Sequence, residues 1–260
     1  MNVWPFWKMT GAGNDFVVGD DDPPPPLSPP ELARRVCARR SGIGADGLLL
    51  VGRGDPVRVR YWNADGSEAA FCGNGARCAA LYAVRRGRAR WPARLVLGGH
   101  EYEAAPDPRG VRISVDPPAR GPIVTVRAAG ALRAGRLVTA GVPHVLFESP
   151  AVETENLAEL RGALAAADAE LAARANLTVY AITGPGAALV RTLERGSGET
   201  LACGSAALAV AAVLLGGGET CRVVPPSGLP LFVRRRADGR LDLAGEARLV
   251  YRGEWLPGED

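Results

Sequence analysis

The pattern of apolar and polar positions divides the first half of the chain into strands and two helices. Alternation over residues 3–20 around a Gly11–Asn14 turn predicts a hairpin. A capping-box spacing from Ser28 to Glu31 predicts a helix that runs to about Arg40. An Ala-rich segment predicts a second helix that begins near Gly73 and ends near residue 85. Short apolar runs predict strands at 43–51, 57–62, 95–97, 102–104 and 111–115.

The same alternation begins again after Asp116–Pro117–Pro118, which we take as a boundary between two domains. The pattern predicts a long helix over 156–173 and a Gly-rich turn at 196–200. This turn leads to Cys203 and a second Ala-rich helix. Strands are predicted at 124–126, 136–138, 179–182 and 187–193, and short strands close the chain.

One segment of the sequence is repeated about half a chain length later. Residues 71–80 resemble residues 202–210, and each segment places a cysteine between a strand and an Ala-rich helix. Two distant copies of one strand–turn–helix unit predict a pseudo-symmetric pair of α/β (α+β) domains rather than a solenoid. We expect an N-terminal half at 1–118, which carries Cys72, and a C-terminal half at 119–246, which carries Cys203.

Composition narrows the class of protein. The 260 residues are 47% hydrophobic and 23% charged, which is enough for one large domain or two small ones. The net charge is +3 and the basic residues are scattered, so a nucleic-acid partner is not expected. No apolar stretch is long enough to span a membrane, and the first residues lack the features of a signal peptide. A cytoplasmic protein without a membrane partner is therefore predicted.

Each of the two repeated cysteines lies at the predicted start of a helix, a position that favours a reactive thiol. Unpaired N–H groups at a helix start favour an anion there, whether a thiolate or a bound carboxylate. Gly73 and Gly204 let a ligand approach the backbone, and Asn74 and Ser205 add hydrogen-bonding side chains. If the two copies face each other across a cleft, two thiols flank one small site. Two acid/base groups on opposite faces of one carbon suit a stereochemical inversion.

Other interpretations of the cysteines have to be weighed. A single buried cysteine near a helix start is more often a small hydrophobic residue than a catalyst. A zinc site would need paired short spacings, which are absent from the sequence, so no metal is expected. A redox dithiol is an alternative, because two tuned thiols in one cleft can oxidise to a disulfide. The remaining cysteines lack the following glycine and are interpreted as structural: Cys37, Cys78 and Cys221.

The chain resembles the diaminopimelate epimerase family over nearly its whole length. Seven motifs carry this resemblance in the family's order: KMTGAGNDF at 8–16, GIGADG at 42–47, WNADGS at 62–67, CGNGARC at 72–78, GVPH at 141–144, RAN at 174–176 and ERGSGETLACGS at 194–205. The resemblance implies two halves, each a mixed sheet wrapped around a central helix, with the last strand (247–260) returning to the first half. It also implies a homodimer that needs neither pyridoxal phosphate nor any other cofactor.

The resemblance assigns roles to individual residues. Cys72 and Cys203 are the catalytic thiolate and thiol, whose roles exchange in the reverse reaction, and His144 and Glu194 lie beside the α-amino group of an amino-acid substrate. Arg195 is expected to bind the distal carboxylate in a bidentate manner. The backbone and side chains of Gly73, Asn74, Gly204 and Ser205 are expected to bind the reacting carboxylate. The remaining substrate-binding residues implied by the resemblance are Asn14, Asn63 and Asn176.

One departure from the family pattern affects the substrate. Val142 replaces an asparagine often found before the Pro–His pair, which removes a polar group from the distal end of the expected substrate site. The sequence therefore predicts an epimerase that interconverts LL- and meso-diaminopimelate, and leaves open racemisation of another amino acid on the same fold. A non-catalytic or redox-sensing member is the third hypothesis, and the presence of both cysteines and Glu194 argues against it.

Overall fold

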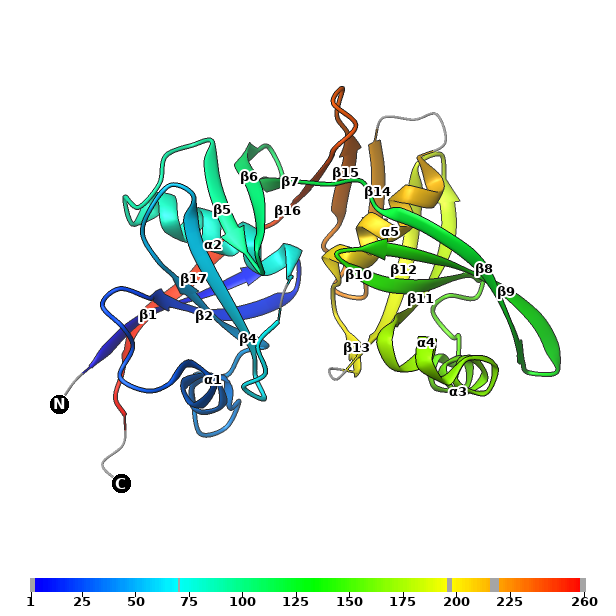
Figure 1. Cartoon of the computed structure of the whole chain (residues 1–260), viewed down its shortest axis with the longest axis horizontal. Coiled ribbons are helices and arrows are strands. Elements are labelled where there is room, and N and C mark those ends of the chain that lie inside the picture. The colour runs from blue at the N-terminus through cyan, green and yellow to red at the C-terminus, as the bar shows by residue number, and fades with distance from the viewer. Residues whose placement is uncertain (1–2, 70, 196–197, 216–219, 258–260) are drawn as a thin grey trace. The chain divides into compact units, whose positions relative to one another are not determined.

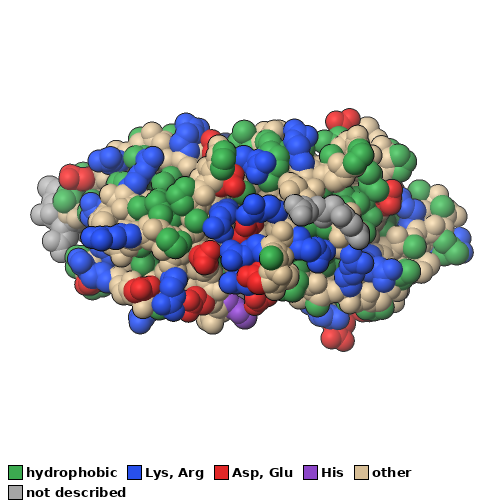
Figure 2. Space-filling view, turned by 90° about the horizontal axis from the view of Figure 1, so that it is seen from above, with side chains coloured by type: hydrophobic (Ala, Val, Ile, Leu, Met, Phe, Trp, Pro, Cys, Tyr) green, Lys and Arg blue, Asp and Glu red, His purple; other side chains and the backbone are tan. Residues whose placement is uncertain are grey.

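The computed structural model describes residues 3–69, 71–195, 198–215 and 220–257, and the chain divides into two compact units. Unit 1 comprises Met1–Ser114 and Ala244–Asp260, and unit 2 comprises Val115–Leu243. Within the described ranges, none of the helices has the length and apolar character that a membrane span requires. Acidic and basic side chains lie next to one another on the face drawn in Figure 2.

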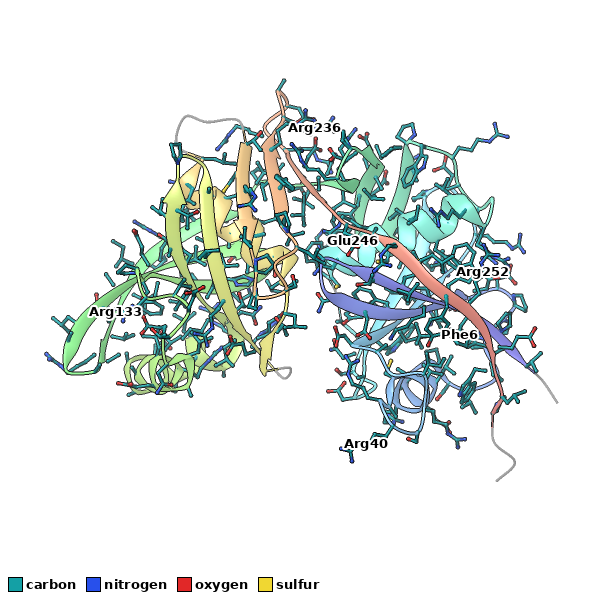
Figure 3. The ribbon with its side chains drawn as sticks, turned by 180° about the vertical axis from the view of Figure 1, so that it is seen from behind. Phe6, Arg40, Arg133, Arg236, Glu246 and Arg252 are labelled. Carbon is teal, nitrogen blue, oxygen red and sulfur yellow. The ribbon has the colours of Figure 1, made fainter. Side chains whose placement is uncertain are left out.

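Unit 1 is a mixed sheet with a buried helix (Figure 1). Its strands are β1 (Trp4–Gly11), β2 (Asn14–Asp20), β3 (Gly47–Val51), β4 (Val57–Asn63), β5 (Ala93–Leu97), β6 (His100–Asp107), β7 (Gly110–Val115) and β17 (Arg248–Trp255). The pairs β2–β3 and β4–β5 are parallel, and the other neighbours are antiparallel. The C-terminal β17 pairs with β1, and Figure 3 shows Arg252 and Phe6 on these two strands.

Helix α2 (Gly73–Arg85) is the central element of unit 1 and packs against β1 to β5. Small side chains such as Ala76, Ala79 and Ala80 allow the strands to approach the helix closely, and all three are buried. Helix α1 (Pro29–Cys37) is amphipathic and packs its apolar face into a cluster of buried hydrophobic residues in unit 1. In that cluster Leu32 and Val36 pack with Leu48 and other apolar residues of the sheet.

Unit 2 has the same plan. Its strands are β8 (Ala119–Ala128), β9 (Ala131–Ala140), β10 (Val142–Glu148), β11 (Asn176–Gly184), β12 (Ala187–Glu194), β13 (Gly198–Thr200), β14 (Thr220–Val224) and β15 (Leu231–Arg235). Strand β16 (Leu241–Gly245) begins in unit 2 and ends in unit 1. The pairs β10–β11 and β12–β14 are parallel. Helix α5 (Gly204–Leu214) is the central helix and packs against strands of this sheet, with Gly204 to Ala212 all buried. The prediction of a mixed α/β fold with a central helix in each half is confirmed.

Several predicted boundaries are wrong for local reasons. The helix predicted over 156–173 is interrupted at Asp168, which ends α3 (Leu157–Ala167) and begins α4 (Ala169–Arg174). The Asp168 side chain accepts a hydrogen bond from the backbone N–H of Leu171, 2.8 Å away, and so competes with a continuous helix. Both helices pack on the unit 2 core through residues that include Leu160 and Leu171.

Two strand predictions also need correction. The strand predicted at 43–51 begins at Gly47, because the N–H groups of Ile43 and Ala45 bond to the end of α1 at Val36 and Cys37. That helix ends at Cys37 rather than near Arg40. Strand β10 was not predicted from the sequence, because Pro143 within Val142–Glu148 argues against a strand. Part of the predicted Gly-rich turn, residues 196–197, lies outside the described residues.

Candidate active site

The first half-site lies at the start of α2. Cys72 is the N-cap residue of this helix, with an extended backbone (φ −147°, ψ 104°), and its Sγ accepts a hydrogen bond from the Gly75 N–H at 3.3 Å. A Cβ atom on residue 75 would lie 3.4 Å from this sulfur and 3.3 Å from Cδ2 of Leu49. The sulfur therefore takes the place of the usual capping oxygen, and glycine leaves the room that it needs.

A chain of side-chain amides runs from this helix start into the hairpin. Nδ2 of Asn74 donates to Oδ1 of Asn14 at 2.5 Å, and Nδ2 of Asn14 donates to Oδ2 of Asp46 at 3.0 Å. At the other end, Nη2 of Arg77 donates to Oδ1 of Asn74 at 2.8 Å. A guanidinium can only donate and a carboxylate can only accept, so the two ends fix the orientation of both amides.

Charged groups hold the far end of the amide chain in place. Arg39 bonds to the carboxylates of both Asp46, at 2.7 Å, and Asp15, at 3.0 Å. Lys8, the chain's single lysine, donates to Asp15 at 2.6 Å. Burial opposes ionisation of Asp15, but hydrogen bonds from Arg39 and Lys8 outweigh it and lower the pKa of this carboxyl. The Asp15 carboxylate is therefore ionised at neutral pH, and Arg39 links it to Asp46, the acceptor for Asn14.

Asn63 ends β4 beside this network. It is paired in register with Gly47 on β3, directly after Asp46, and its Nδ2 donates to Oγ of Ser67 at 3.0 Å. The unit 1 residues singled out by the sequence thus lie on neighbouring elements: Asn14, Asn63, Cys72, Gly73 and Asn74.

The second half-site lies at the start of α5. Cys203 is the N-cap residue, with an extended backbone (φ −134°, ψ 111°) close to that of Cys72. Its Sγ lies 3.2 Å from Oγ of Ser205, and this hydroxyl lies 2.9 Å from Nε2 of His144. The sequence repeat therefore corresponds to a structural repeat, in which each cysteine precedes the first turn of a buried helix.

A chain of hydroxyl groups continues behind His144. Nδ1 of His144 lies 3.0 Å from Oγ1 of Thr178, which lies 3.2 Å from Oγ1 of Thr192. Burial, with a contribution from the positive charge of Arg195, lowers the pKa of His144 to about 3. The imidazole is therefore neutral at physiological pH and carries one N–H. The sequence analysis did not identify Thr178 or Thr192, because two threonines on strands give no signal of their own.

The remaining unit 2 residues gather where β11 begins and β12 ends. His144 on β10 is paired with Asn176 on β11, and Oδ1 of Asn176 accepts the backbone N–H of Arg195 at 3.0 Å. Oε1 of Glu194 accepts a hydrogen bond from the Thr200 hydroxyl at 2.6 Å. Strand pairing thus brings His144, Asn176, Glu194 and Arg195 to one end of the unit 2 sheet.

The other three cysteines behave as the sequence predicted for structural residues, since all are buried. Burial raises the pKa of Cys37 to about 12, of Cys78 to about 12 and of Cys221 to about 11. Each of these thiols therefore stays protonated near neutral pH.

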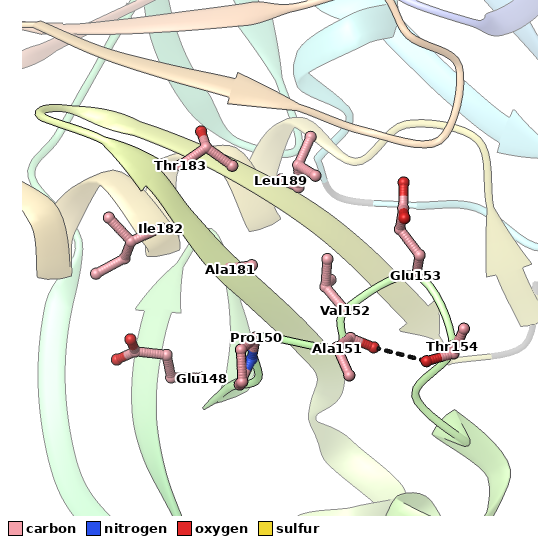
Figure 4. Close-up of a pocket in the computed structure, with 10 residues that line it drawn as sticks. All are labelled: Glu148, Pro150, Ala151, Val152, Glu153, Thr154, Ala181, Ile182, Thr183 and Leu189. Atoms are coloured by element: carbon pink, nitrogen blue, oxygen red, sulfur yellow. Dashed lines mark hydrogen bonds between the residues drawn. The ribbon is translucent and has the colours of Figure 1, made fainter.

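Unit 2 also holds a pocket of about 310 Å³, whose lining residues precede Cys203 in the sequence. Figure 4 shows that it lies between the segment after β10 and strands β11 and β12, where Thr154 donates to the carbonyl oxygen of Ala151. Its lining comprises Glu148, Pro150, Ala151, Val152, Glu153, Thr154, Ala181, Ile182, Thr183 and Leu189. None of the residues singled out by the sequence lines this pocket.

The fold of this chain is similar to that of solved structures that include a predicted epimerase and a probable racemase. A probable proline racemase from Agrobacterium radiobacter K84 matches 98% of this chain and 93% of its own, with a TM-score of 0.73 and 14% identity. A predicted epimerase from Pseudomonas aeruginosa matches 98% of this chain and all of its own, with a TM-score of 0.68 and 21% identity. These similarities establish the fold that the two units share with that class of enzyme.

Comparison of sequences is more specific. The diaminopimelate epimerase family model matches residues 6–105. Diaminopimelate epimerase of Xylella fastidiosa (strain M23) is 35% identical over 96% of this chain and 95% of that protein. The enzyme of the same name from Desulforudis audaxviator is 36% identical over 96% of this chain and 99% of that protein. The chain therefore belongs to the diaminopimelate epimerase family, and it is an enzyme of the amino-acid epimerase class.

Proposed function

We propose that this enzyme interconverts LL-2,6-diaminopimelate and meso-diaminopimelate, a step in the synthesis of lysine and of peptidoglycan precursors. The observation that carries the proposal is the repeated helix start. Cys72 and Cys203 have nearly the same backbone conformation, cap the two central helices and are each followed by glycine. Such a pair of thiols is what a reaction with two acid/base groups requires.

The proposed reaction moves one proton on each side of the α-carbon. The thiolate of one cysteine removes the α-proton and becomes a thiol, while the thiol of the other delivers its proton to the opposite face and becomes a thiolate. Before and after the reaction the two sulfurs together carry one proton. The reverse reaction exchanges their roles. The scheme requires both sulfurs to face one substrate carbon in the reacting complex.

The backbone at both helix starts supports this chemistry. As the α-proton leaves, negative charge grows on the substrate carboxylate. Backbone N–H groups in the first helical turns after Cys72 and Cys203, together with the side chains of Asn74 and Ser205, would stabilise it. Gly73 and Gly204 allow the carboxylate to approach these N–H groups closely.

The polar residues at the end of the unit 2 sheet provide the rest of the proposed substrate site. Glu194 would accept a hydrogen bond from the α-amino group, and Arg195 would bind the distal carboxylate. His144 would act on Cys203 through the Ser205 hydroxyl that lies between them. Asn14, Asn63 and Asn176 would complete the contacts with the substrate. No metal or organic cofactor takes part in the proposed mechanism.

A second candidate is the racemisation of another amino acid on the same fold. Val142 and His144 are two residues apart on β10, so their side chains leave the strand on the same face. An apolar side chain next to His144 on this face favours a substrate whose distal end is less polar than that of diaminopimelate. The homodimer implied by the family and the cytoplasmic location expected from the sequence remain predictions.

Loss of the α-proton in deuterium oxide tests the proposal. The purified chain is incubated under reducing conditions with LL-diaminopimelate, proline or glutamate, and the α-proton signal is followed by NMR. Exchange with diaminopimelate alone supports the proposal, exchange with another amino acid alone supports the second candidate, and exchange with none indicates a non-catalytic member. Cys72→Ala and Cys203→Ala should abolish inversion, whereas Cys221→Ala, which removes a buried thiol, should not.

A further inference from the structure

Arg77 is a buried cation one turn into α2. Its side chain is fully buried (0% exposed), and it donates to the carbonyl oxygen of Gly73 at 3.3 Å and to Oδ1 of Asn74 at 2.8 Å. Its third acceptor is the backbone carbonyl of Glu246, at 3.5 Å. All three acceptors are uncharged, and no ion pair joins Arg77 to a carboxylate within the described ranges. A charge in such a place is costly unless a negative group lies near it.

The Cys72 sulfur is well placed to be that negative group. The guanidinium contacts the carbonyl of Gly73, the residue that follows Cys72, so the cation lies at the same helix start as the sulfur. Burial lowers the pKa of Arg77 to about 10, opposed by the nearby Cys78, Cys72 and Glu246, and the guanidinium is still charged at neutral pH. A thiolate at residue 72 would thus gain from Arg77, from the Gly75 N–H and from the helix start together.

Two other titratable groups act on Arg77, namely Cys78 and Glu246. The Cys78 thiol stays protonated, because burial raises its pKa to about 12. Glu246, labelled in Figure 3, accepts a hydrogen bond from Arg248 at 3.1 Å. Asp46, at the far end of the amide chain, is paired with Arg39 at 2.7 Å.

The second half-site has a different electrostatic character. The residue equivalent to Arg77 in the repeat is Leu208, and α5 contains no charged residue from Gly204 to Leu214. The Cys203 sulfur exchanges a hydrogen bond with the Ser205 hydroxyl, behind which stands the neutral His144. The charged groups at this end of unit 2 include Arg195, whose exposed charge is screened by water, and the adjacent Glu194 of opposite sign. Arg161 also lies here, and its guanidinium donates to the carbonyl oxygens of Ala175 at 2.7 Å and Leu193 at 2.9 Å.

We propose that the unliganded enzyme rests with a thiolate at Cys72 and a thiol at Cys203, and that Arg77 is the positioning residue that sets this order. The proposal rests on the function proposed above, since it assigns the two forms of one thiol/thiolate pair. The proposal implies that the resting enzyme reacts directly with only one of the two configurations at the α-carbon. This is the configuration whose α-proton faces the Cys72 thiolate.

Alkylation tests the proposal without any substrate. The native chain is treated briefly with iodoacetamide from pH 5 to pH 10, and the modification of each cysteine is measured by peptide mass spectrometry at low conversion. The midpoint of each pH profile, rather than the absolute rate, reports the thiolate, so the different exposure of the two sulfurs does not affect the comparison. Cys72 should have its midpoint at least one pH unit below that of Cys203. Equal midpoints, or the reverse order, would overturn the proposal.

Substitution of Arg77 separates its charge from its packing. Arg77→Gln should raise the Cys72 midpoint by about one pH unit, which reduces alkylation at pH 7 about tenfold, and should leave the Cys203 profile unchanged. Arg77→Lys keeps the charge and should restore most of the shift. Arg85→Gln removes an exposed charge from the same helix and should change neither profile.

The outcomes distinguish this proposal from the proposed function. If the wild-type chain exchanges the α-proton of diaminopimelate but Arg77→Gln leaves the Cys72 midpoint in place, the role of Arg77 is wrong and the function stands. If the alkylation order is as expected but no amino acid exchanges, the proposed function is wrong. Should Arg77→Gln fail to fold, the wild-type order of midpoints still decides the assignment of the thiolate.

Discussion

Nε2 of His144 lies 2.9 Å from Oγ of Ser205, so the one buried histidine of the chain contacts a hydroxyl that in turn contacts the Cys203 sulfur. Ser205→Ala would leave the buried imidazole without this partner and would break its connection to Cys203. We expect the free energy of unfolding to fall by about 1–3 kcal/mol and α-proton exchange to slow about tenfold or more. Urea denaturation and NMR exchange measure the two effects, and Thr154→Ala, an exposed hydroxyl, should change neither.

The neutral state of His144 predicts how stability depends on pH. Its pKa in the folded chain is lowered to about 3, below its ordinary value of 6.5. Between these values the unfolded chain binds a proton that the folded chain does not, so the contribution of His144 is complete above pH 6.5 and is lost as the pH falls toward 3. The slope from this group reaches about 1.4 kcal/mol per pH unit.

Carboxylates also titrate in this range, so the slope of His144 is obtained by difference. Urea denaturation of His144→Gln between pH 7 and pH 5 should show a flatter dependence than that of the wild type. The exposed His100 supplies the matched control, because His100→Gln should retain the wild-type slope. A wild-type slope in the His144 variant would show that this imidazole is protonated in the folded chain.

Gly75 is predicted to be essential for the position of the Cys72 sulfur. In Gly75→Ala the new methyl group would lie 3.4 Å from Sγ and 3.3 Å from Leu49. We expect α-proton exchange to fall about tenfold or more, because a small displacement of a reacting group has a large effect on the rate. Gly162, in α3, has open space at its Cβ position, and Gly162→Ala should instead stabilise the chain by about 0.4–1 kcal/mol with no loss of exchange.

The raised pKa values of three buried thiols predict which cysteines stay unreactive in the native chain. Iodoacetamide at pH 8 should modify Cys72 and Cys203 and leave the three thiols with raised pKa values, Cys37, Cys78 and Cys221, unmodified. In urea all five should react at similar rates. Peptide mapping by mass spectrometry provides the measurement, and rapid modification of Cys78 in the native chain would contradict the packing around α2.

The break between α3 and α4 predicts an effect on stability alone. Asp168→Ala removes the hydrogen bond to the Leu171 N–H and should lower the free energy of unfolding by about 0.5–2 kcal/mol. Asp168→Asn retains an accepting oxygen and should recover most of this loss. Because Asp168 is not among the proposed site residues and its side chain bonds to the Leu171 N–H, exchange by the folded variants should match that of the wild type.

The repeat of a cysteine before an Ala-rich helix was sufficient to predict the central helices and the cysteine at the start of each, because small residues and a helix start are local properties of the sequence. Strand β10 could not be predicted in this way. Its pairing with Asn176 and its neighbours on β11 depends on residues more than thirty positions away, which override the local effect of Pro143.

The same reasoning explains which parts of the site the sequence did not reveal. Asn74, Ser205 and His144 were singled out, but the contact of Asn74 with Arg77 and that of Ser205 with His144 are defined only in the folded chain. An arginine among the alanines of a buried helix was the available signal for Arg77. Thr178 had no comparable signal, because threonine is common in strands.

The return of β17 to pair with β1 has a consequence for the synthesis of the chain. All residues of unit 2 leave the ribosome before the last strand of unit 1 does, although unit 1 begins at the N-terminus. The edge of β1 that pairs with β17 therefore stays unpaired while the whole of the second unit is translated and folds. Unit 1 is therefore the first unit to begin synthesis and the last to be completed. A nascent chain stopped just before residue 248 would leave one edge of β1 (Trp4–Gly11) unpaired.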